Sequence, residues 1–382
     1  MKSIHYIGYH TKDDNPNEYY CFPAPSNKIG YIITVLKNID YYVNVLSLGE
    51  SIVSHGSKKV IIDQQETINY VGTIGKANVL LKIGARLWLL FQILWYLLQK
   101  TDQKSTVMVY HTLETRNIIK LARFFKKFTL IYEIEEIFSA VYQKSDSQIK
   151  AELKSLSIAD GYILVNDLLR DKFQIPILNS VVCYGEYTQL NNIRPAKQSS
   201  DIVLVYAGVI AGPGSDVYLS IDSMAYLPKN YILKIVGYGT ENDLKNLRYY
   251  IAVCNKNLDG DRIFFDGKKT GLQYTDYLAT CDIGLCTRVL ADAYSDYTFP
   301  SKVMVYLNNG LKVISSKIKC IEYSKVSEFI YFYEQSAPKA VAETVLKIDL
   351  NQNSNTSELD FLHNNFKIDL DNVLQQAKFK IN

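Results

Sequence analysis

The sequence has little of what metal, disulfide and nucleic-acid sites require. Its five histidines never pair at a spacing typical of metal ligands, and its six cysteines include no CxxC pair. The 42 basic residues are nearly balanced by 39 acidic ones, so the chain lacks the dense basic stripe that binds a phosphate backbone. We therefore expect no metal and no nucleic-acid partner, and we expect the cysteines to be small buried side chains in a reducing compartment.

The sequence also lacks a secretion signal and a long hydrophobic run. Its first residues, MKSIHYIGYH, soon turn polar. The apolar run 85–98 is interrupted only by Arg86 and Gln92, and it is shorter than the about 20 residues that a transmembrane helix takes. We expect this helix to be buried in a domain core; the alternative is that Trp88 and Trp95, with flanking cations, lie on a lipid surface. These features predict a cytoplasmic protein, with peripheral contact at the inner face of the membrane as the alternative.

Composition and length favour a two-domain globular protein. Hydrophobic residues make up 48% of the 382 residues and charged residues 21%. Short β-rich runs alternate with helical stretches, which is typical of parallel sheets in α/β proteins. The polar stretch 186–201 predicts a linker. We therefore predict two doubly wound, Rossmann-like domains at 1–185 and 202–350, followed by a helical segment at 351–382.

In the second half, the residues that follow each predicted strand indicate a phosphate site. Ligands of doubly wound sheets bind beyond the carboxyl ends of the strands. Glycine allows close approach of a ligand to the backbone, and cations neutralise phosphate. The residues at these strand ends are Gly208 in GVIAGPGSD, Gly237 in GYG, Lys268 in DGKK and Arg288.

A helix start in the run YTFPSKVMVYLNNGLKVISS adds a second anion-binding feature. Pro300 can occupy the first helical turn, so that the free amides of Ser301 and Lys302 point outward. The alternative for Lys302 is a solvated lysine at a helix start. We favour a phosphate contact, because its ammonium and the amides would act on the same ligand.

Three residues of the first half are candidates for contact with a sugar. His111 follows one predicted strand, and Glu135 and Glu136 follow the next. The alternatives are a structural histidine and carboxylates stabilised by a helix dipole. Asp259 and Asp261 imitate a metal-binding DxD motif but precede a strand, so we interpret them as a turn.

The run FPSKVMVYLNNGLKVISS resembles the donor-site segment of the retaining family 4 glycosyltransferases and their capsule and O-antigen relatives. Upstream, YAG is similar to the glycine loop that opens the family's donor domain, IVGYG to its helix-start glycines, and YTDYLATCDIGLC to the helix and strand before the donor loop. The closing FLHNNFKIDLDNVLQQ is similar to the helix that returns to the first domain. The resemblance implies a GT-B fold, in which two Rossmann-like domains face a cleft and a C-terminal helix crosses back to the first domain.

The resemblance also implies an activity. The family transfers a hexosyl group from a nucleoside-diphosphate sugar to a glycan or lipid-linked glycan in bacterial polysaccharide biosynthesis, and for this chain we expect a UDP-sugar as donor. Transfer retains the anomeric configuration and needs neither metal nor cofactor. By position, Asp292 or Asp296 would contact sugar hydroxyls. The resemblance implies catalytic roles for Asp296, Glu135, Glu136 and His111.

Two departures from the family pattern keep other functions open. Tyr297 and Val305 stand where the family commonly has glutamates. An inverting enzyme, a non-catalytic GT-B protein that binds glycan or stabilises a partner glycosyltransferase, and a sugar-nucleotide epimerase are the alternatives. GVIAGPG also fits a dehydrogenase cofactor pattern, but the YxxxK of such enzymes occurs here at 96–100, upstream of the glycines.

Overall fold

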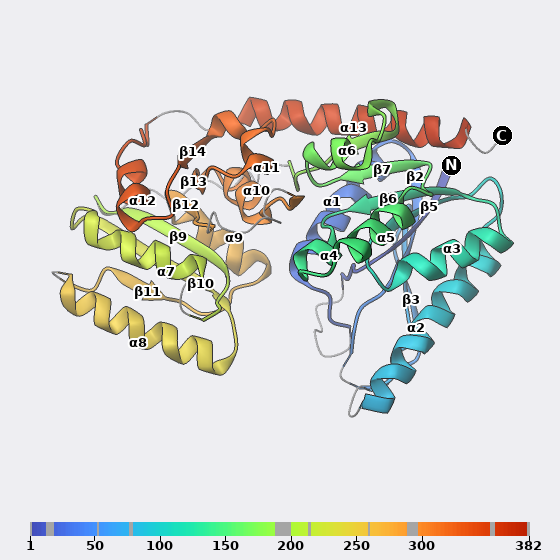
Figure 1. The fold of residues 1–382 in the computed structure, drawn as a ribbon, viewed down its shortest axis with the longest axis horizontal. Coiled ribbons are helices and arrows are strands. Elements are labelled where there is room, and N and C mark those ends of the chain that lie inside the picture. Colours follow the sequence, from blue (N-terminus) through green and yellow to red (C-terminus); the bar gives the residue numbers. More distant parts are fainter. Residues whose placement is uncertain are drawn as a thin grey trace. The chain divides into compact units, whose positions relative to one another are not determined.

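The chain folds into two compact α/β units (Figure 1). The computed structural model describes residues 2–12, 19–51, 53–75, 79–187, 200–212, 215–258, 260–288, 297–351 and 356–379. Unit 1 comprises residues 1–186 and 364–382, and unit 2 comprises residues 187–363. Helix α13 (Thr356–Phe379) begins in unit 2 and ends in unit 1. The predicted α/β class with two parallel sheets is confirmed.

The described strands of unit 1 form an eight-stranded sheet in the order β3-β4-β2-β1-β5-β6-β7-β8. Neighbouring strands are parallel, except that β3 pairs antiparallel with β4. β5 and β6 are buried along their whole length, as expected where helices cover both faces of a sheet. The strands are β1 (Lys2–Gly8), β2 (Tyr41–Ser47), β3 (Lys58–Asp63), β4 (Glu66–Tyr70), β5 (Thr106–Tyr110), β6 (Thr129–Ile134), β7 (Gly161–Leu164) and β8 (Ser180–Val182).

The last part of α13 packs on unit 1. The ring of Phe366 stacks on that of Tyr31, with centroids 5.7 Å apart. Val373 leaves no spare room beside β7, because a Cβ on Gly161 would lie 3.0 Å from its Cγ1. The other helices of this unit are α1 (Pro23–Asn38), α2 (Val79–Lys100), α3 (Thr115–Phe125), α4 (Phe138–Val141), α5 (Asp146–Leu156), α6 (Leu168–Phe173) and the short 3-10 helix η1 (Ile177–Asn179).

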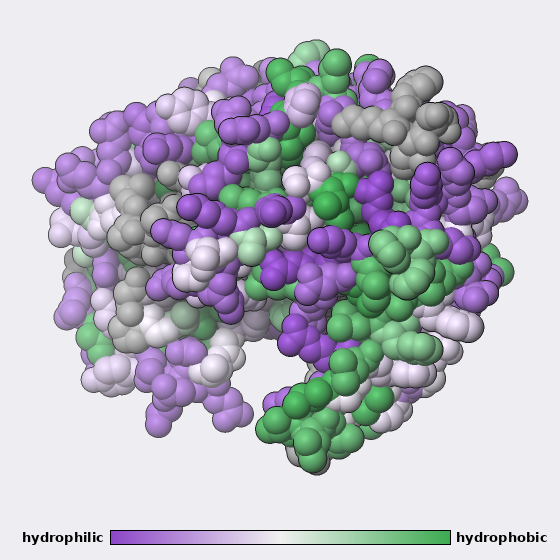
Figure 2. Space-filling view, turned by 45° about the vertical axis from the view of Figure 1, so that its right-hand side comes forward, coloured by the Kyte–Doolittle hydropathy of each residue, from purple (hydrophilic) through white to green (hydrophobic). Residues whose placement is uncertain are grey.

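The expectation that the apolar helix is buried is wrong. Within α2, Ile93 and Leu97 are buried, whereas Trp88, Phe91 and Trp95 are 41%, 51% and 56% exposed. The reason is that one narrow stripe of the helix reaches the sheet, and a sequence that is apolar nearly all round does not reveal how much of it is covered. Figure 2 shows the resulting hydrophobic surface along this helix. By length and composition α2 could cross a membrane, a test that core helices of soluble proteins also pass.

Unit 2 has a six-stranded, fully parallel sheet in the order β11-β10-β9-β12-β13-β14. This is the 3-2-1-4-5-6 order of a dinucleotide-binding fold, and the order in which strands are added to the sheet reverses between β9 and β12. The strands are β9 (Ile202–Val209), β10 (Tyr231–Tyr238), β11 (Ile263–Phe265), β12 (Ile283–Cys286), β13 (Lys312–Ser316) and β14 (Ile330–Tyr333). The helices are α7 (Asp216–Ser223), α8 (Glu241–Asn257), α9 (Gly271–Ala279), α10 (Ser301–Asn308), α11 (Lys319–Glu322), α12 (Pro338–Val345) and the 3-10 helices η2 (Met224–Tyr226) and η4 (Ser327–Phe329).

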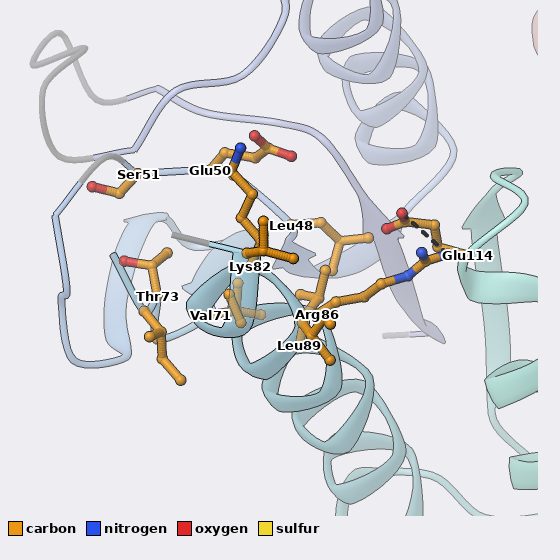
Figure 3. A pocket seen from close by; sticks show the side chains of 15 residues that line it. Leu48, Glu50, Ser51, Val71, Thr73, Lys82, Arg86, Leu89 and Glu114 are labelled. Carbon is orange, nitrogen blue, oxygen red and sulfur yellow. Dashed lines mark ion pairs between the residues drawn. The ribbon is translucent and has the colours of Figure 1, made fainter. Parts of the chain in front are cut away.

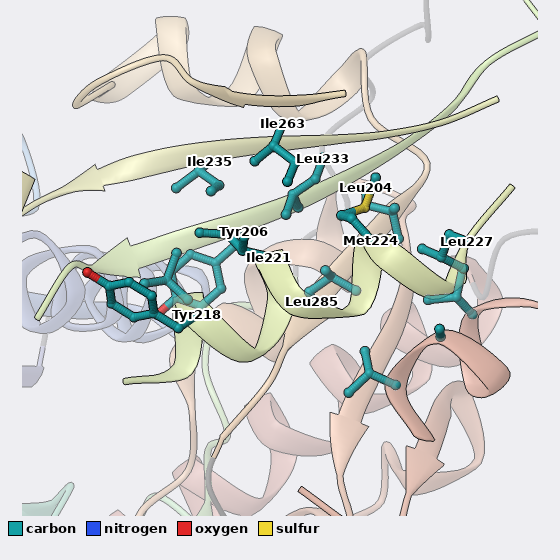
Figure 4. Packing of buried hydrophobic residues seen from close by; sticks show 14 of the residues in the cluster. Leu204, Tyr206, Tyr218, Ile221, Met224, Leu227, Leu233, Ile235, Ile263 and Leu285 are labelled. Atoms are coloured by element: carbon teal, nitrogen blue, oxygen red, sulfur yellow. The ribbon is translucent and has the colours of Figure 1, made fainter. Parts of the chain in front are cut away.

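The core of unit 2 forms between its strands and α7 (Figure 4). Leu204 of β9 and Leu285 of β12 are fully buried, and Ile221 of α7 packs in the same cluster. This packing holds the strand ends and the first turn of α7 in fixed positions relative to one another. Those strand ends carry the candidate site.

Candidate functional site

Two glycines pair across the ends of β9 and β10. Gly208 is opposite Gly237 in the parallel register. A Cβ on Gly237 would lie 2.0 Å from the carbonyl oxygen of Gly208, and one on Gly239 would lie 2.3 Å from that of Ile210. The glycines at 237 and 239 are therefore required by the close approach of the two chain segments, independently of any ligand.

Lys302 lies at the end of β9, against the ring of Tyr206 and near Asp216. Its Nζ is 4.1 Å from the centroid of the Tyr206 ring, and a Cβ on Gly208 would lie 3.4 Å from it. Within the described part of the chain, Lys302 forms no ion pair with a carboxylate. Burial lowers its pKa, but Tyr206, Cys286 and the nearby Asp216 raise it, and the net shift is upward. Lys302 therefore carries a positive charge that is half-buried and available to a ligand.

Two helix starts point to the same region. α10 begins at Ser301, directly after Pro300, as expected from the sequence, and Ser301 is exposed. The first turn of α7 is fixed to the end of β12, because the Thr287 hydroxyl donates to the carbonyl oxygen of Asp216 at 2.7 Å. Free amides at helix starts and a lysine ammonium together favour an anion.

The other two cations of the predicted phosphate site are differently placed. Arg288 donates through Nη1 to Oγ1 of Thr298 at 2.7 Å, so it links the end of β12 to the segment before α10. Lys268 is exposed and lies 5.5 Å from the ring centroid of Tyr238, beside β10 rather than β9. Arg288 is thus held by the protein itself, and Lys268 lies at the neighbouring strand.

Tyr306 has a structural role that the sequence did not reveal. Its hydroxyl accepts a hydrogen bond from the backbone N–H of Ala207 at 2.8 Å. Its ring fills the space beside Gly284, where a Cβ would lie 2.3 Å from the ring atoms. Tyr306 therefore fixes α10, and with it Lys302, against β9 and β12. The tyrosine of the resemblance motif was the available signal.

The positions that depart from the family pattern are partly described. Tyr297 and Val305 are both half-buried, and neither offers a carboxylate. Asp292, Asp296 and Asp259 lie outside the described residues. Asp261 is exposed and precedes β11.

In unit 1, His111 is part of a buried hydrogen-bonded pair. It is 1% exposed, and its Nε2 lies 2.8 Å from Oε1 of Glu152. The same carboxylate accepts backbone N–H groups of Phe138 and Ser139 at 3.0 and 2.7 Å. Burial raises the pKa of Glu152, but the bonds to His111 and Ser139 outweigh it and lower the pKa overall. This arrangement supports the structural interpretation of His111.

Glu135 belongs to a cluster that the sequence did not reveal. Its carboxylate pairs with the ammonium of Lys28, which also donates to the carbonyl oxygen of Cys183 at 2.6 Å. Beside it, the hydroxyl of Tyr6 donates to Oε2 of Glu133 at 2.6 Å. Burial, with Glu135 nearby, raises the pKa of Glu133 to about 8. A lysine within an otherwise apolar helical face, KIGYIITVL, was the signal for this cluster.

Glu136, the next residue of the candidate set, is half-buried and lies after β6. The structure therefore separates the three first-half candidates. His111 is enclosed, Glu135 is neutralised by Lys28, and Glu136 is partly accessible.

Unit 1 also contains a cavity of about 470 Å³ beside the first turns of α2 (Figure 3). Apolar side chains such as Leu48, Val71 and Leu89 line part of it. Figure 3 shows Lys82 and Arg86 projecting from α2, with Arg86 paired to Glu114 at 3.3 Å. Polar lining is added by Glu50, Ser51 and Thr73. The cavity thus has both apolar and charged walls.

Metal and disulfide chemistry find little support in the described residues. Across these residues, no group of three or more His, Cys, Asp and Glu is placed to hold a metal ion. The six cysteines are free, and all but the half-buried Cys254 are buried. Burial raises the pKa of the Cys183 thiol to about 12, which is typical of a structural rather than a reactive cysteine.

Comparison with solved structures gives the fold. The UDP-forming α,α-trehalose-phosphate synthase from Burkholderia xenovorans, in complex with glucose-6-phosphate, matches with a TM-score of 0.69 at 8% identity, covering 98% of this chain and 99% of that one. Sucrose-phosphate synthase from Thermosynechococcus elongatus matches with a TM-score of 0.66 at 13% identity, covering 100% and 97%. Anabaena HepE in complex with UDP matches with a TM-score of 0.61 at 14% identity, covering 99% of each chain.

These similarities extend over whole chains, so the protein has the GT-B fold of these glycosyltransferases. At such low identity the similarity establishes the fold alone. No protein-family model and no curated protein sequence matches the chain.

Proposed function

We propose that the protein is a glycosyltransferase that moves a hexosyl group from a nucleoside-diphosphate sugar to a glycan acceptor. The observation that carries the proposal is Lys302, a half-buried cation held by Tyr206 at the start of α10 and beside the end of β9. A doubly wound sheet binds ligands where its strand order reverses, and in unit 2 this point lies between β9 and β12. The GT-B fold adds support, because proteins that share it act on nucleotide sugars.

The donor in this proposal is a UDP-sugar. HepE is in complex with UDP, and the Burkholderia synthase is described as UDP-forming. In this chain the diphosphate would meet the ammonium of Lys302 and the amides of Ser301 and Lys302. Arg288 and Lys268 would bind more peripheral phosphate oxygens, or act through the loops that carry them.

The proposed reaction follows that of the retaining family 4 enzymes, which the donor segment resembles. The bond between the anomeric carbon and the leaving phosphate oxygen breaks as the acceptor hydroxyl attacks the same face. Lys302 and the helix amides stabilise the negative charge that develops on the diphosphate, and a phosphate oxygen receives the hydroxyl proton. An inverting reaction is the alternative, since Tyr297 and Val305 supply no carboxylate.

The acceptor in this proposal binds unit 1. The cavity beside α2 combines an apolar wall with Ser51, Thr73 and Lys82, and this mixture suits a glycan attached to an apolar carrier. We therefore infer a lipid-linked glycan of bacterial polysaccharide biosynthesis as acceptor, with the enzyme at the cytoplasmic side of the membrane.

A non-catalytic GT-B protein is the second candidate function, favoured by Tyr297 and Val305. A thermal-shift panel of UDP, GDP, ADP, CMP and their sugars distinguishes the two at the first step. A ligand at 100 times its dissociation constant stabilises the folded state by about 2.7 kcal/mol. Stabilisation by UDP-sugars, followed by release of UDP in the presence of acceptor, supports the transferase. Failure of every nucleotide to bind contradicts it, and conversion of the sugar without acceptor would indicate an epimerase.

A further inference from the structure

The outer face of α2 is an exposed apolar surface of unusual extent. Its most exposed large side chains are Val79 at 71%, Leu80 at 80% and Leu87 at 63%. Trp88 and Trp95 lie on either side of Phe91, whose ring stacks on both at 5.6 and 6.1 Å. Monomeric soluble proteins rarely leave such a continuous apolar surface without a partner.

The opposite face of α2 is fixed to unit 1. The side-chain amide of Gln92 forms two hydrogen bonds with the backbone of Gly72, at 2.7 and 2.8 Å. The hydroxyl of Tyr96 lies 2.9 Å from Nδ1 of His5 in β1. A helix bound to its sheet by polar contacts along one side cannot cross a bilayer as a lipid-surrounded span. It can lie along a surface.

The charge of α2 is of one sign. Its sequence, VLLKIGARLWLLFQILWYLLQK, contains no Asp or Glu but has cations at Lys82, Arg86 and Lys100. At 100° per residue, Lys82 and Lys100 lie on the side of α2 that carries the buried Ile93 and Leu97, and Lys82 lines the cavity. The outer face of α2 itself is therefore apolar and carries no acidic residue.

Helix α3 continues this surface. Arg86 pairs with Glu114 just before α3, and Lys126 just after α3 donates to the carbonyl oxygen of Thr101 just after α2. The two helices therefore run side by side in the same direction. Phe124 and Phe125, at the end of α3, are 82% and 62% exposed. Lys120, one turn before Phe124, and Lys127 are exposed as well. Cations beside exposed aromatic side chains are typical of surfaces that lie in a membrane interface.

We propose that the outer face of α2, continued by Phe124 and Phe125 of α3, docks on an anionic lipid bilayer. The apolar side chains enter the headgroup and acyl boundary, and the exposed Lys120 and Lys127 beside the two phenylalanines meet anionic headgroups. A second copy of the chain is the weaker occupant, since a symmetric pairing of this surface with itself would bring the exposed lysines of α3 together.

Docking of this face also affects the acceptor. The cavity of unit 1 is lined by Val79, Lys82 and Ile83 of α2, so its wall belongs to the lipid-facing helix. A bilayer-held acceptor would then meet the cavity at the level of the headgroups. This part of the inference rests on the proposed function, whereas the docking itself does not.

Vesicle binding by the full chain tests the docking. The probes are vesicles of equal parts phosphatidylglycerol and phosphatidylcholine, compared with pure phosphatidylcholine. We expect the double variant Trp88→Ser with Trp95→Ser to bind the mixed vesicles roughly tenfold or more weakly, because two large apolar side chains no longer enter the interface. The matched control is Tyr249→Ser with Leu272→Ser in unit 2, whose side chains are 74% and 81% exposed. This control should bind as the original chain does.

Charge is tested separately. Lys120→Gln and Lys127→Gln should each weaken binding to the mixed vesicles by about fivefold and leave binding to pure phosphatidylcholine unchanged. Equal binding by the tryptophan double variant and the original chain would overturn the docking. So would a concentration-dependent dimer that the tryptophan substitutions dissociate, since the face would then be covered by a second copy.

UDP binding distinguishes failure of this inference from failure of the proposed function. The tryptophan and lysine variants should retain the UDP affinity of the original chain. Intact UDP binding without any vesicle binding would refute the docking alone, and vesicle binding without nucleotide binding would refute the transferase alone.

Discussion

Both units place a lysine at the carboxyl ends of their strands, but they use its charge differently. In unit 1, Lys28 pairs with Glu135 and donates to the carbonyl oxygen of Cys183. In unit 2, Lys302 contacts the ring of Tyr206 and, within the described residues, no carboxylate. The charge of Lys28 is neutralised within the protein, whereas the charge of Lys302 remains for a ligand. Similar positions in two related sheets can therefore serve stability in one and binding in the other.

The largest expected effect comes from removing the internal charge of unit 1. Lys28→Met leaves the half-buried carboxylate of Glu135 without its cation, beside the buried Glu133, so we expect the free energy of unfolding to fall by about 3 to 5 kcal/mol. Urea denaturation measures this change. The control is Lys339→Met, which removes an exposed ion pair with Glu343 and should cost at most about 0.5 kcal/mol. Equal free energies of unfolding for the Lys28 and Lys339 variants would contradict the structural role of Lys28, and with it the contrast to Lys302.

A smaller effect is expected at Lys302, and in binding more than in folding. Lys302→Gln should weaken UDP affinity by roughly tenfold or more, through a lost charge-assisted contact of about 1.5 to 3 kcal/mol. Calorimetric affinities for UDP and uridine measure it, and uridine binding should hardly change. Loss of the contact with Tyr206 should lower the free energy of unfolding by about 1 kcal/mol.

Lys268→Gln is the matched control for Lys302, because it removes an exposed lysine beside the neighbouring strand. Its effect on UDP affinity should be smaller. Equal losses for UDP and uridine in the Lys302 variant would instead make Lys302 a structural residue.

The next effect is the pH dependence of the free energy of unfolding, which tests the cluster of Lys28, Glu133 and Glu135 in unit 1. The pKa of Glu133 is about 8 in the folded state, above its ordinary value of 4.5, so the folded state holds a proton that the unfolded state has lost. The contribution of Glu133 to stability is therefore complete below about pH 4.5 and is lost as the pH rises through 8.

Glu133→Gln should remove this dependence, because glutamine resembles the protonated acid. From about pH 5 to about pH 8.5, the free energy of unfolding of the variant should gain at least about 1 kcal/mol relative to the original chain. Denaturation curves at the two pH values measure this difference. An equal change in the free energy of unfolding for the variant and the original chain would mean that Glu133 is ionised in the folded state over this whole pH range.

The smallest expected effect is that of EDTA on transfer activity. Because Lys302 and the helix amides supply the positive charge for the diphosphate, we expect the rate to stay unchanged. Loss of activity that manganese or magnesium restores would show that the site depends on a metal after all.

Much of the fold could be predicted from the sequence, because strand alternation and turn residues are local signals. β2 was harder to recognise, since the turn between α1 and β2 contains Asp40, which adopts a left-handed φ of 63° where glycine is usual. β4 begins with Glu66, a fully buried carboxylate paired with Lys12 and Lys37. Hydropathy alone does not indicate a strand that starts on a buried charge.

The site was predictable only where its parts are close together in the sequence. The start of α10 at Ser301 follows from Pro300. The ring of Tyr206 below Lys302 and the pairing of Lys28 with Glu135 depend on tertiary contacts between distant residues. The exposure of α2 depends in the same way on which of its faces the sheet covers.

The path of α13 has a consequence for the order of folding during synthesis. Residues 364–379 pack on unit 1, yet they follow all of unit 2 in the chain. On a ribosome, unit 2 can therefore be complete while unit 1 still lacks the helix that stacks on Tyr31 and covers Gly161. Until then an apolar strip of unit 1 is open to chaperones and to misassembly. Unit 1 is translated first but is the last to complete its packing.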